Sequence, residues 1–292
     1  MRTHKLIALL ILWLIGTPPG IALEVTDDSG SEVRLTRPAT RIISLAPHIT
    51  ELLFAVGAGE NIVATVEFSD FPNDARDIMR IGNSQHLSYE ALVSLTPDLV
   101  IAWGTGNGEA IISRLKALDV AVYVNEPRTL PHIARSLRHF GLLSGRSEMG
   151  ERAAEDFLEQ YNALLNDNKH QQPVSVFYQI WNEPLTTLND NHVASDVIRL
   201  CGGVNIFGQT AAIAPRINVE SVIEADPEVI IVSGMGESKP EWLDKWREWP
   251  DITAVKNSRL HLLQADLLQR HTPRLLEGAR RLCEIISRAR AG

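Results

Sequence analysis

The feature that most constrains this 292-residue chain is an internal repeat at an offset of 130 residues. Residues 87–103 read LSYEALVSLTPDLVIAW, and residues 217–233 read INVESVIEADPEVIIVS. The identical residues at equivalent positions are Glu90 and Glu220, Pro97 and Pro227, and Ile101 and Ile231. Self-similarity at one long offset indicates that a structural unit occurs twice. The sequence therefore predicts two lobes of similar topology.

Short apolar runs alternate with helical patterns along most of the chain, after an entry hairpin expected at 24–36. The strand-like runs lie at 41–45, 62–66, 99–103, 120–124, 174–180, 229–232 and 260–263. This alternation predicts parallel sheets covered by helices, which is an α/β fold.

A helical pattern of some twenty residues, 147–166, lies between the two halves and would be about 30 Å long. We therefore predict two Rossmann-like α/β lobes, 23–145 and 169–292, joined by one long helix over 146–168. A cleft between two such lobes is a preferred place to bind a small molecule.

The first 22 residues have the features of a cleaved secretory signal. A basic start is followed by the ten-residue apolar run LIALLILWLI, and Gly20 and Ala22 are small residues at the −3 and −1 positions of a cleavage site. The run is about half as long as a membrane span requires. We predict a signal peptide over 1–22 and export of the mature chain, with an uncleaved anchor as the alternative.

The chain has two cysteines, Cys201 and Cys283. In a protein exported to an oxidising compartment, such a pair predicts one structural disulfide. Two free buried thiols are the alternative. A metal site is less well supported, because neither cysteine has a second Cys or a His at ligand spacing.

The charge balance and the motifs exclude several classes of function. A formal charge of −8, from 28 basic and 36 acidic residues, argues against a protein that binds nucleic acid. The sequence has no phosphate loop, nucleophile triad or HExxH helix. The remaining enzyme alternative is a glycoside hydrolase, because WNEP at 181–184 resembles an acid/base segment. We expect no enzyme, because a repeat of two lobes does not fit a hydrolase barrel.

Five stretches carry a resemblance to a known family: SLAPHITELLFAVG, FSDFP, LTPDLVIAWGTGN, LCGGVNIF and HTPRLLEGARRLC. From about Arg41 to the C-terminus, the chain resembles the cobalamin, haem and siderophore class of periplasmic substrate-binding proteins of ABC importers. Within this class it is most similar to the members that bind vitamin B12. The resemblance implies that the helix between the lobes is rigid. It also implies a monomeric periplasmic protein that captures a corrinoid and delivers it to the importer's permease dimer and ATPase, without chemistry or a cofactor of its own.

The resemblance also implies which residues bind the ligand. They are Phe68 and Trp103 in the first lobe, and Trp181, Asp266, Leu267, Leu268, Gln269 and Arg270 in the second. Phe68 stands where the B12 binders have a tyrosine. Asp266 and Arg270 would offer an acceptor and a fork of donors to the amides of a corrin.

Two departures from the B12 binders keep haem or a ferric siderophore as the alternative ligand. Ser84 and Ala214 stand where those proteins have tryptophans, so two flat apolar surfaces are missing. Because cobalt and haem iron can accept an imidazole, His86 is a weak candidate axial ligand. We expect no other metal site.

The glutamates of the repeat lie where two short helices begin. Ser88 and Asn218 are typical N-caps, so Glu90 and Glu220 occupy the first turns, where a carboxylate stabilises the helix dipole. By their positions in the family, they also match residues that dock on the importer. Two equivalent carboxylates, one on each lobe, would suit a two-fold symmetric permease dimer.

Overall fold

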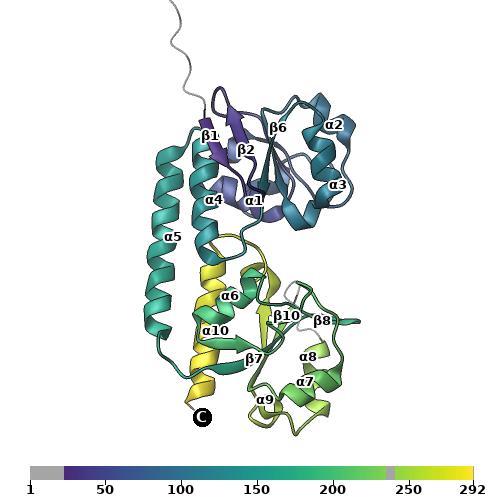
Figure 1. Cartoon of the computed structure of the whole chain (residues 1–292), viewed down its shortest axis with the longest axis vertical. Coiled ribbons are helices and arrows are strands. Elements are labelled where there is room, and N and C mark those ends of the chain that lie inside the picture. Colours follow the sequence, from purple (N-terminus) through teal and green to yellow (C-terminus); the bar gives the residue numbers. More distant parts are fainter. Residues whose placement is uncertain (1–22, 235–240, 292) are drawn as a thin grey trace, which may run out of the picture.

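The computed structural model describes residues 23–234 and 241–291, and it consists of two α/β lobes placed along the long axis of the molecule (Figure 1). The predicted signal peptide, 1–22, lies outside the described residues. Helix α5 (Ser147–Asn168) runs alongside both lobes. The prediction of two α/β lobes joined by a long helix is confirmed. The limits 23–145, 146–168 and 169–292 remain our proposal for the division of the chain.

The first lobe contains a parallel sheet with the strand order β4-β3-β5-β6. Its strands are β3 (Ile42–Ser44), β4 (Ile62–Ala64), β5 (Leu99–Trp103) and β6 (Ala121–Asn125). Its helices are α1 (Pro47–Ala55), α2 (Tyr89–Ser94), α3 (Gly104–Lys116) and α4 (Leu130–Leu143), with 3-10 turns at Gly59–Asn61 and Asn73–Asp77. The predicted entry hairpin is formed by β1 (Leu23–Thr26) and β2 (Glu32–Leu35). Strand β5 reads LVIAW and is buried over its first four residues, as expected for a strand covered on both faces.

The second lobe contains a sheet with the order β11-β10-β7-β8, in which β9 also pairs with β7. Its strands are β7 (Val174–Asn182), β8 (Leu185–Thr187), β9 (Gly203–Asn205), β10 (Val229–Gly234) and β11 (Leu260–Gln264). Its helices are α6 (Val193–Leu200), α7 (Val219–Ala225), α8 (Glu241–Lys245), α9 (Thr253–Lys256) and α10 (Leu275–Arg290), with 3-10 turns at Trp246–Glu248 and Ala265–Leu267. The sequence did not predict β8 and β9, because three-residue strands are too short to show an alternating pattern.

The sequence repeat is also a structural repeat. The side chains of Ser88 and Asn218 cap α2 and α7, accepting hydrogen bonds from backbone N–H groups at 3.3 and 2.9 Å. Ten residues further along, Asp98 accepts from the N–H of Thr40 at 2.9 Å, at the start of a neighbouring strand. Its equivalent, Glu228, accepts from the N–H of Ser175 at 2.8 Å, where β7 begins. The same side-chain contacts therefore fix the same helix–strand unit in both lobes.

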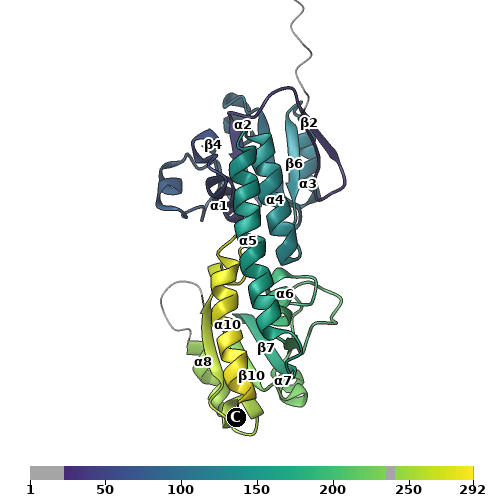
Figure 2. The same cartoon turned by 90° about the vertical axis from the view of Figure 1, so that its left-hand side faces the viewer.

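Helix α5 connects the lobes through a continuous hydrophobic core. Its first half packs against α4, where Gly141 and Gly150 meet so closely that a Cβ on Gly141 would lie 2.7 Å from the Gly150 Cα. Its second half packs against α6 and α10 (Figure 2). Buried Phe157 of α5 belongs to one cluster with Ile42 of the first lobe and Val176 of the second. The two lobes therefore share a core.

The predicted disulfide is confirmed. Cys201 at the end of α6 is bonded to Cys283 of α10, with an S–S distance of 2.04 Å. Both cysteines are buried in the shared core. Within the described ranges, no helix has the length and apolar character needed to cross a membrane.

Candidate ligand-binding site

The carboxyl ends of the parallel strands of both sheets meet where the lobes face each other. Trp103 ends β5, and His48 follows β3 by one turn. Both rings lie close to His271 of the second lobe, with centroid distances of 6.3 Å from Trp103 and 5.2 Å from His48. In α/β proteins, ligands bind beyond the carboxyl ends of the strands. The fold therefore places Trp103 at the position where a ligand site is expected.

The floor of the junction between the lobes contains the buried rings of His48, His192 and His271, which carry no charge. Burial lowers the pKa of His48 to about 3, while the Asn125 side chain raises it and the Arg270 charge lowers it further. Burial lowers the pKa of His192 to about 4. Burial also holds the pKa of His271 well below its ordinary value, and the other two imidazoles act in the same direction. All three imidazoles are therefore neutral at neutral pH.

Several polar atoms in this floor have no partner among the described residues. They are Nε2 of His48, Nε1 of Trp103 and Oγ1 of Thr272, each shielded from solvent. Buried polar atoms are normally hydrogen-bonded, so unpaired ones cluster at sites with a function or an ordered water. No group of three or more His, Cys, Asp or Glu residues in the described chain is arranged to hold a metal ion.

Arg270 links the two lobes through ion pairs. Its Nη1 lies 2.9 Å from Oε1 of Glu51 and 3.1 Å from Oδ1 of Asp70, both in the first lobe. Its Nε lies 2.9 Å from Oδ1 of Asp266. Its Nη2 donates to the carbonyl oxygen of Phe68 at 3.3 Å. Arg270 is therefore paired with Asp266 and with the first lobe, and the role of both residues as ligand contacts stays a prediction.

Glu51 is a site residue that sequence reasoning missed. Its side chain is only 3% exposed, and Arg274 reaches its two oxygens at 3.0 and 3.1 Å while Arg270 binds it from the other side. These partners lie more than 200 positions away in the chain. The sequence did offer one signal for Glu51. It is the one carboxylate in the apolar helix ITELLFAV, and a carboxylate that is buried with such a helix needs a cation as its partner.

Phe68 is exposed to solvent. Its side chain is 74% exposed, and its φ of 65° lies in the left-handed region that bulky residues rarely adopt. The hydrogen bond from Arg270 holds its carbonyl. Three residues further along the chain, Phe71 borders a cavity of about 270 Å³ between the lobes. Its lining residues are Glu51, Phe54, Ala55, Phe71 and Pro72 of the first lobe, and Pro273 and Arg274 of the second. Strained, exposed aromatics of this kind are typical of ligand contacts.

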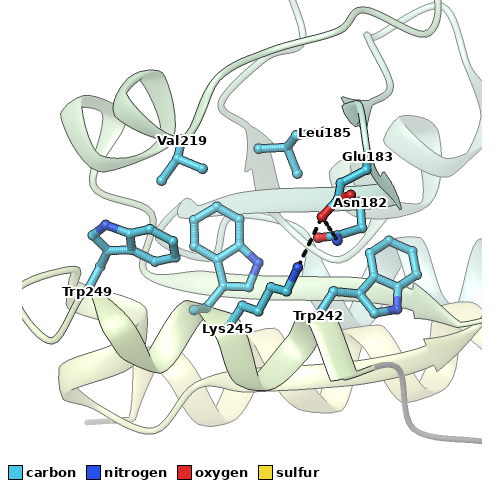
Figure 3. A pocket seen from close by; sticks show the side chains of 8 residues that line it. Asn182, Glu183, Leu185, Val219, Trp242, Lys245 and Trp249 are labelled. Atoms are coloured by element: carbon cyan, nitrogen blue, oxygen red, sulfur yellow. Dashed lines mark hydrogen bonds and ion pairs between the residues drawn. The ribbon is translucent and has the colours of Figure 1, made fainter.

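Tryptophans form a wall on the second lobe. Trp181, 49% exposed near the end of β7, lies edge-on to Trp242 of α8 at a centroid distance of 6.3 Å. Together with Asn182 and Glu183, they line a cavity of about 380 Å³. A second cavity of about 260 Å³ adjoins it (Figure 3). Its lining residues are Asn182, Glu183, Leu185, Val219, Trp242, Lys245, Trp246 and Trp249. The spacing in WLDKWREW, which puts three tryptophans on one short helical segment, was the signal that sequence reasoning overlooked.

The remaining predicted residues of the second lobe are placed differently from one another. Leu267 and Leu268 are 3% and 1% exposed, and their role as ligand contacts stays a prediction. The segment forms a tight 3-10 turn that points these side chains inward. Gln269 is half-buried, and its Nε2 donates to Ser233 Oγ at 2.7 Å.

The two positions where the resemblance implies departures, Ser84 and Ala214, lie in different surroundings. The Ser84 carbonyl accepts a hydrogen bond from Asn107 at 2.8 Å, and Asn107 in turn accepts one from the Trp103 N–H at 2.6 Å. Ala214 is exposed, close to the bridge between Arg216 and β8. His86 is exposed on the loop before α2, and its role as an axial ligand stays a prediction.

The hydrolase alternative finds no support at WNEP. Glu183 is 82% exposed and pairs with Lys245 at 3.2 Å, as Figure 3 shows. Glycoside hydrolysis needs two carboxyl groups about 5–9 Å apart. Among the described residues that line the two tryptophan cavities, Glu183 is the one carboxylate.

The structure places the predicted docking residues at the two lobe tips. Glu90 in α2 and Glu220 in α7 are both exposed, and neither forms an ion pair within 23–234 and 241–291. Figure 1 shows both helices on the side of the molecule that faces away from α5. The two carboxylates are therefore available on one side of the molecule.

The chain is similar to known proteins in sequence and in structure. Residues 42–267 match the periplasmic binding protein family. A vitamin B12-binding protein from Vibrio cholerae is 37% identical over 247 residues, which cover 84% of this chain and 88% of the relative. The crystal structure of the periplasmic vitamin B12-binding protein BtuF of Vibrio cholerae matches with a TM-score of 0.80 and 36% identity, covering 86% of this chain and 98% of that one. The periplasmic haem-binding protein RhuT from Roseiflexus shares the fold, with a TM-score of 0.74, 23% identity, and coverage of 86% and 99%. The chain belongs to the periplasmic binding protein family.

Proposed function

We propose that this chain is the periplasmic component of an ABC importer, and that it binds a cobalamin between its lobes as a monomer. The family and the relatives named vitamin B12-binding protein support both the ligand and the location. The protein itself binds and delivers, and the ATPase of the importer supplies the energy.

One observation carries this proposal: flat apolar side chains from both lobes border the junction where the strands end. Trp103 and exposed Phe68 belong to the first lobe, and Trp181 with Trp242 forms the wall of the second. A corrin is a large, nearly planar macrocycle with amide side chains, so aromatic faces suit its surface. Asn182 and the partly exposed carboxylate of Asp266 would meet the amides. Arg270 would act as a positioning residue, because it holds the backbone of Phe68.

Replacing Trp103 with alanine is expected to weaken cobalamin binding at least tenfold, because a large apolar contact is lost. The measurement is isothermal titration of residues 23–292 with cyanocobalamin. The unsubstituted protein should show one site with a Kd at or below about 1 μM, or roughly −8 kcal/mol. Trp103→Phe, which keeps a flat ring, should retain most of the affinity.

Haemin serves as the comparator in the same titration. Tight binding of haemin, with no heat from cyanocobalamin, would keep the importer role and replace the ligand. Binding of neither compound would favour a differently shaped cargo such as a ferric siderophore, because Ser84 and Ala214 leave room where flat surfaces are missing.

Reversing both tip charges, Glu90→Lys with Glu220→Lys, should abolish transport and leave the Kd for the ligand unchanged. Like charges would then face the cations of the permease, and such repulsion suppresses association. Uptake of radiolabelled cyanocobalamin into cells that carry the variant measures the first effect, and titration measures the second. Normal uptake would remove these glutamates from the docking surface, and a weaker Kd would show that they also serve the ligand site.

A further inference from the structure

The two lobe tips share an apolar residue as well as a glutamate. Val93 in α2 and Ile223 in α7 are equivalent in the repeat, three positions after Glu90 and Glu220. The side chains of Val93 and Ile223 are 52% and 38% exposed, although both are large and aliphatic. Each tip therefore presents the same pair, a carboxylate and a β-branched hydrocarbon.

The structure puts each pair on one surface. Residues three apart on a helix are neighbours about one turn from each other. Of the two residues between them in the sequence, the second, Leu92 or Val222, is 1% or 0% exposed and anchors its helix to the sheet. That anchor fixes the rotation of the helix about its axis. The glutamate and the aliphatic residue consequently face solvent in the same relative arrangement on both lobes.

Exposed hydrophobic residues are common and need no explanation when they are scattered. Within the described residues, the large exposed ones are Phe68, Phe71, Met79, Val93, Met149, Leu165, Trp181, Val204 and Ile223. In this set, the repeat offset relates Val93 to Ile223 and no other two members. An exposed aliphatic residue at the same helical position in both lobes, each beside an exposed carboxylate, indicates a shared role.

We propose that each tip docks as a two-part unit, in which the glutamate pairs with a cation and the aliphatic residue enters an apolar depression next to it. The partner is a two-fold symmetric permease that presents this cation and depression once in each half. This inference rests on the proposed delivery to an ABC importer and names how the importer is recognised. Charge complementarity raises the association rate, whereas buried apolar contact lengthens the lifetime of the complex. Because a β-branched side chain is already stiff, its burial loses little conformational entropy.

The test separates the two parts kinetically. The permease–ATPase complex of the same bacterium, in lipid nanodiscs, is immobilised, and binding of the full mature chain is followed by surface plasmon resonance. Val93→Ser with Ile223→Ser should raise the dissociation rate about tenfold at an unchanged association rate, because two half-exposed aliphatic groups lose their burial. Glu90→Gln with Glu220→Gln should instead lower the association rate and its dependence on salt.

The matched control is Val204→Ser, because Val204 is 53% exposed on β9 of the second lobe and lies outside the repeat pair. It should leave both rates unchanged. If the glutamine variants weaken binding while Val93→Ser with Ile223→Ser dissociates like the unsubstituted protein, the inference is wrong and the glutamate docking stands. If neither pair has an effect, docking does not use these tips. If the unsubstituted chain does not bind the importer, the proposed function fails as well.

Discussion

Glu51→Ala is expected to lower the free energy of unfolding by about 3 kcal/mol, because it leaves two guanidinium groups near the protein interior without their shared carboxylate. Glu51 is 3% exposed, and Arg270 and Arg274 are 16% and 25% exposed at their side chains. Both arginines keep weaker partners in Asp70 and Asp266. For that reason the expected loss lies at the lower end of the range for a broken buried pair.

Urea denaturation at pH 7 measures this loss. Glu32→Ala is the matched control, since Glu32 pairs with Arg34 on the surface, with side chains 57% and 63% exposed. Removing that pair should change the free energy of unfolding by less than about 1 kcal/mol. An equally small effect at Glu51 would mean that the charged cluster is open to solvent and does not hold the lobes together. We also expect weaker cobalamin binding by Glu51→Ala, because Arg270 then no longer fixes the loop of Phe68.

Acidification from pH 7.5 to pH 5 is expected to destabilise the protein by about 2 kcal/mol for each of His48 and His192, and His271 should act in the same direction. Their pKa values lie below the ordinary 6.5, at about 3 for His48 and about 4 for His192, because burial penalises the charged imidazolium. Protons therefore bind the unfolded chain first. The stabilising contribution is complete above pH 6.5 and is lost progressively as the pH falls below that value.

The groups that face these rings give a bound proton little compensation. His48 faces the positive charge of Arg270, with the Asn125 amide as its one favourable neighbour. Nδ1 of His192 accepts the N–H of Ala194 at 3.1 Å as the cap of α6, so protonation at this nitrogen removes the cap. His271 lies between the other two rings, at 5.2 and 5.5 Å. Charging two of these imidazoles would place like charges side by side.

Urea denaturation of the triple variant His48→Gln, His192→Gln and His271→Gln at pH 7.5, 6 and 5 isolates the effect. Its stability should depend on pH much less than that of the unsubstituted protein, whatever its absolute value. His170→Gln is the control, because it makes the same exchange of residue types at an exposed position. An equal slope in the triple variant would show that other groups cause the acid sensitivity.

Much of the fold could be predicted because its signals are local. The apolar runs of β3, β5 and β10 are continuous, as strands buried on both faces require, and the caps Ser88 and Asn218 mark helix starts directly. The disulfide followed from the count of two cysteines in an exported chain. The strands β8 and β9 were missed because their pairing with β7 depends on tertiary contact rather than on pattern.

The site was harder to predict, since its decisive contacts join distant parts of the chain. The resemblance pointed to Arg270, but not to Glu51, which lies 219 positions away and occupies its donors. Leu267 and Leu268 were assigned with their whole segment, and the sequence does not show that the 3-10 turn at Ala265–Leu267 leaves both side chains buried. The tryptophans of α8 and of the turn after it were overlooked because the sequence does not show how deeply each one is buried. That burial determines which of them line a cavity.

The core that continues beneath α5 has a consequence for how cargo is exchanged. Wide separation of the lobes would expose Phe157 and the cluster around it to water, at a cost that thermal motion does not meet. Cargo must therefore pass in and out through movements of side chains and short loops such as the one that carries Phe68. Because the lobes keep their shared core, release needs movement of these loops and not of the helix. The receptor would then release its cargo by local loosening and return to its starting shape without refolding.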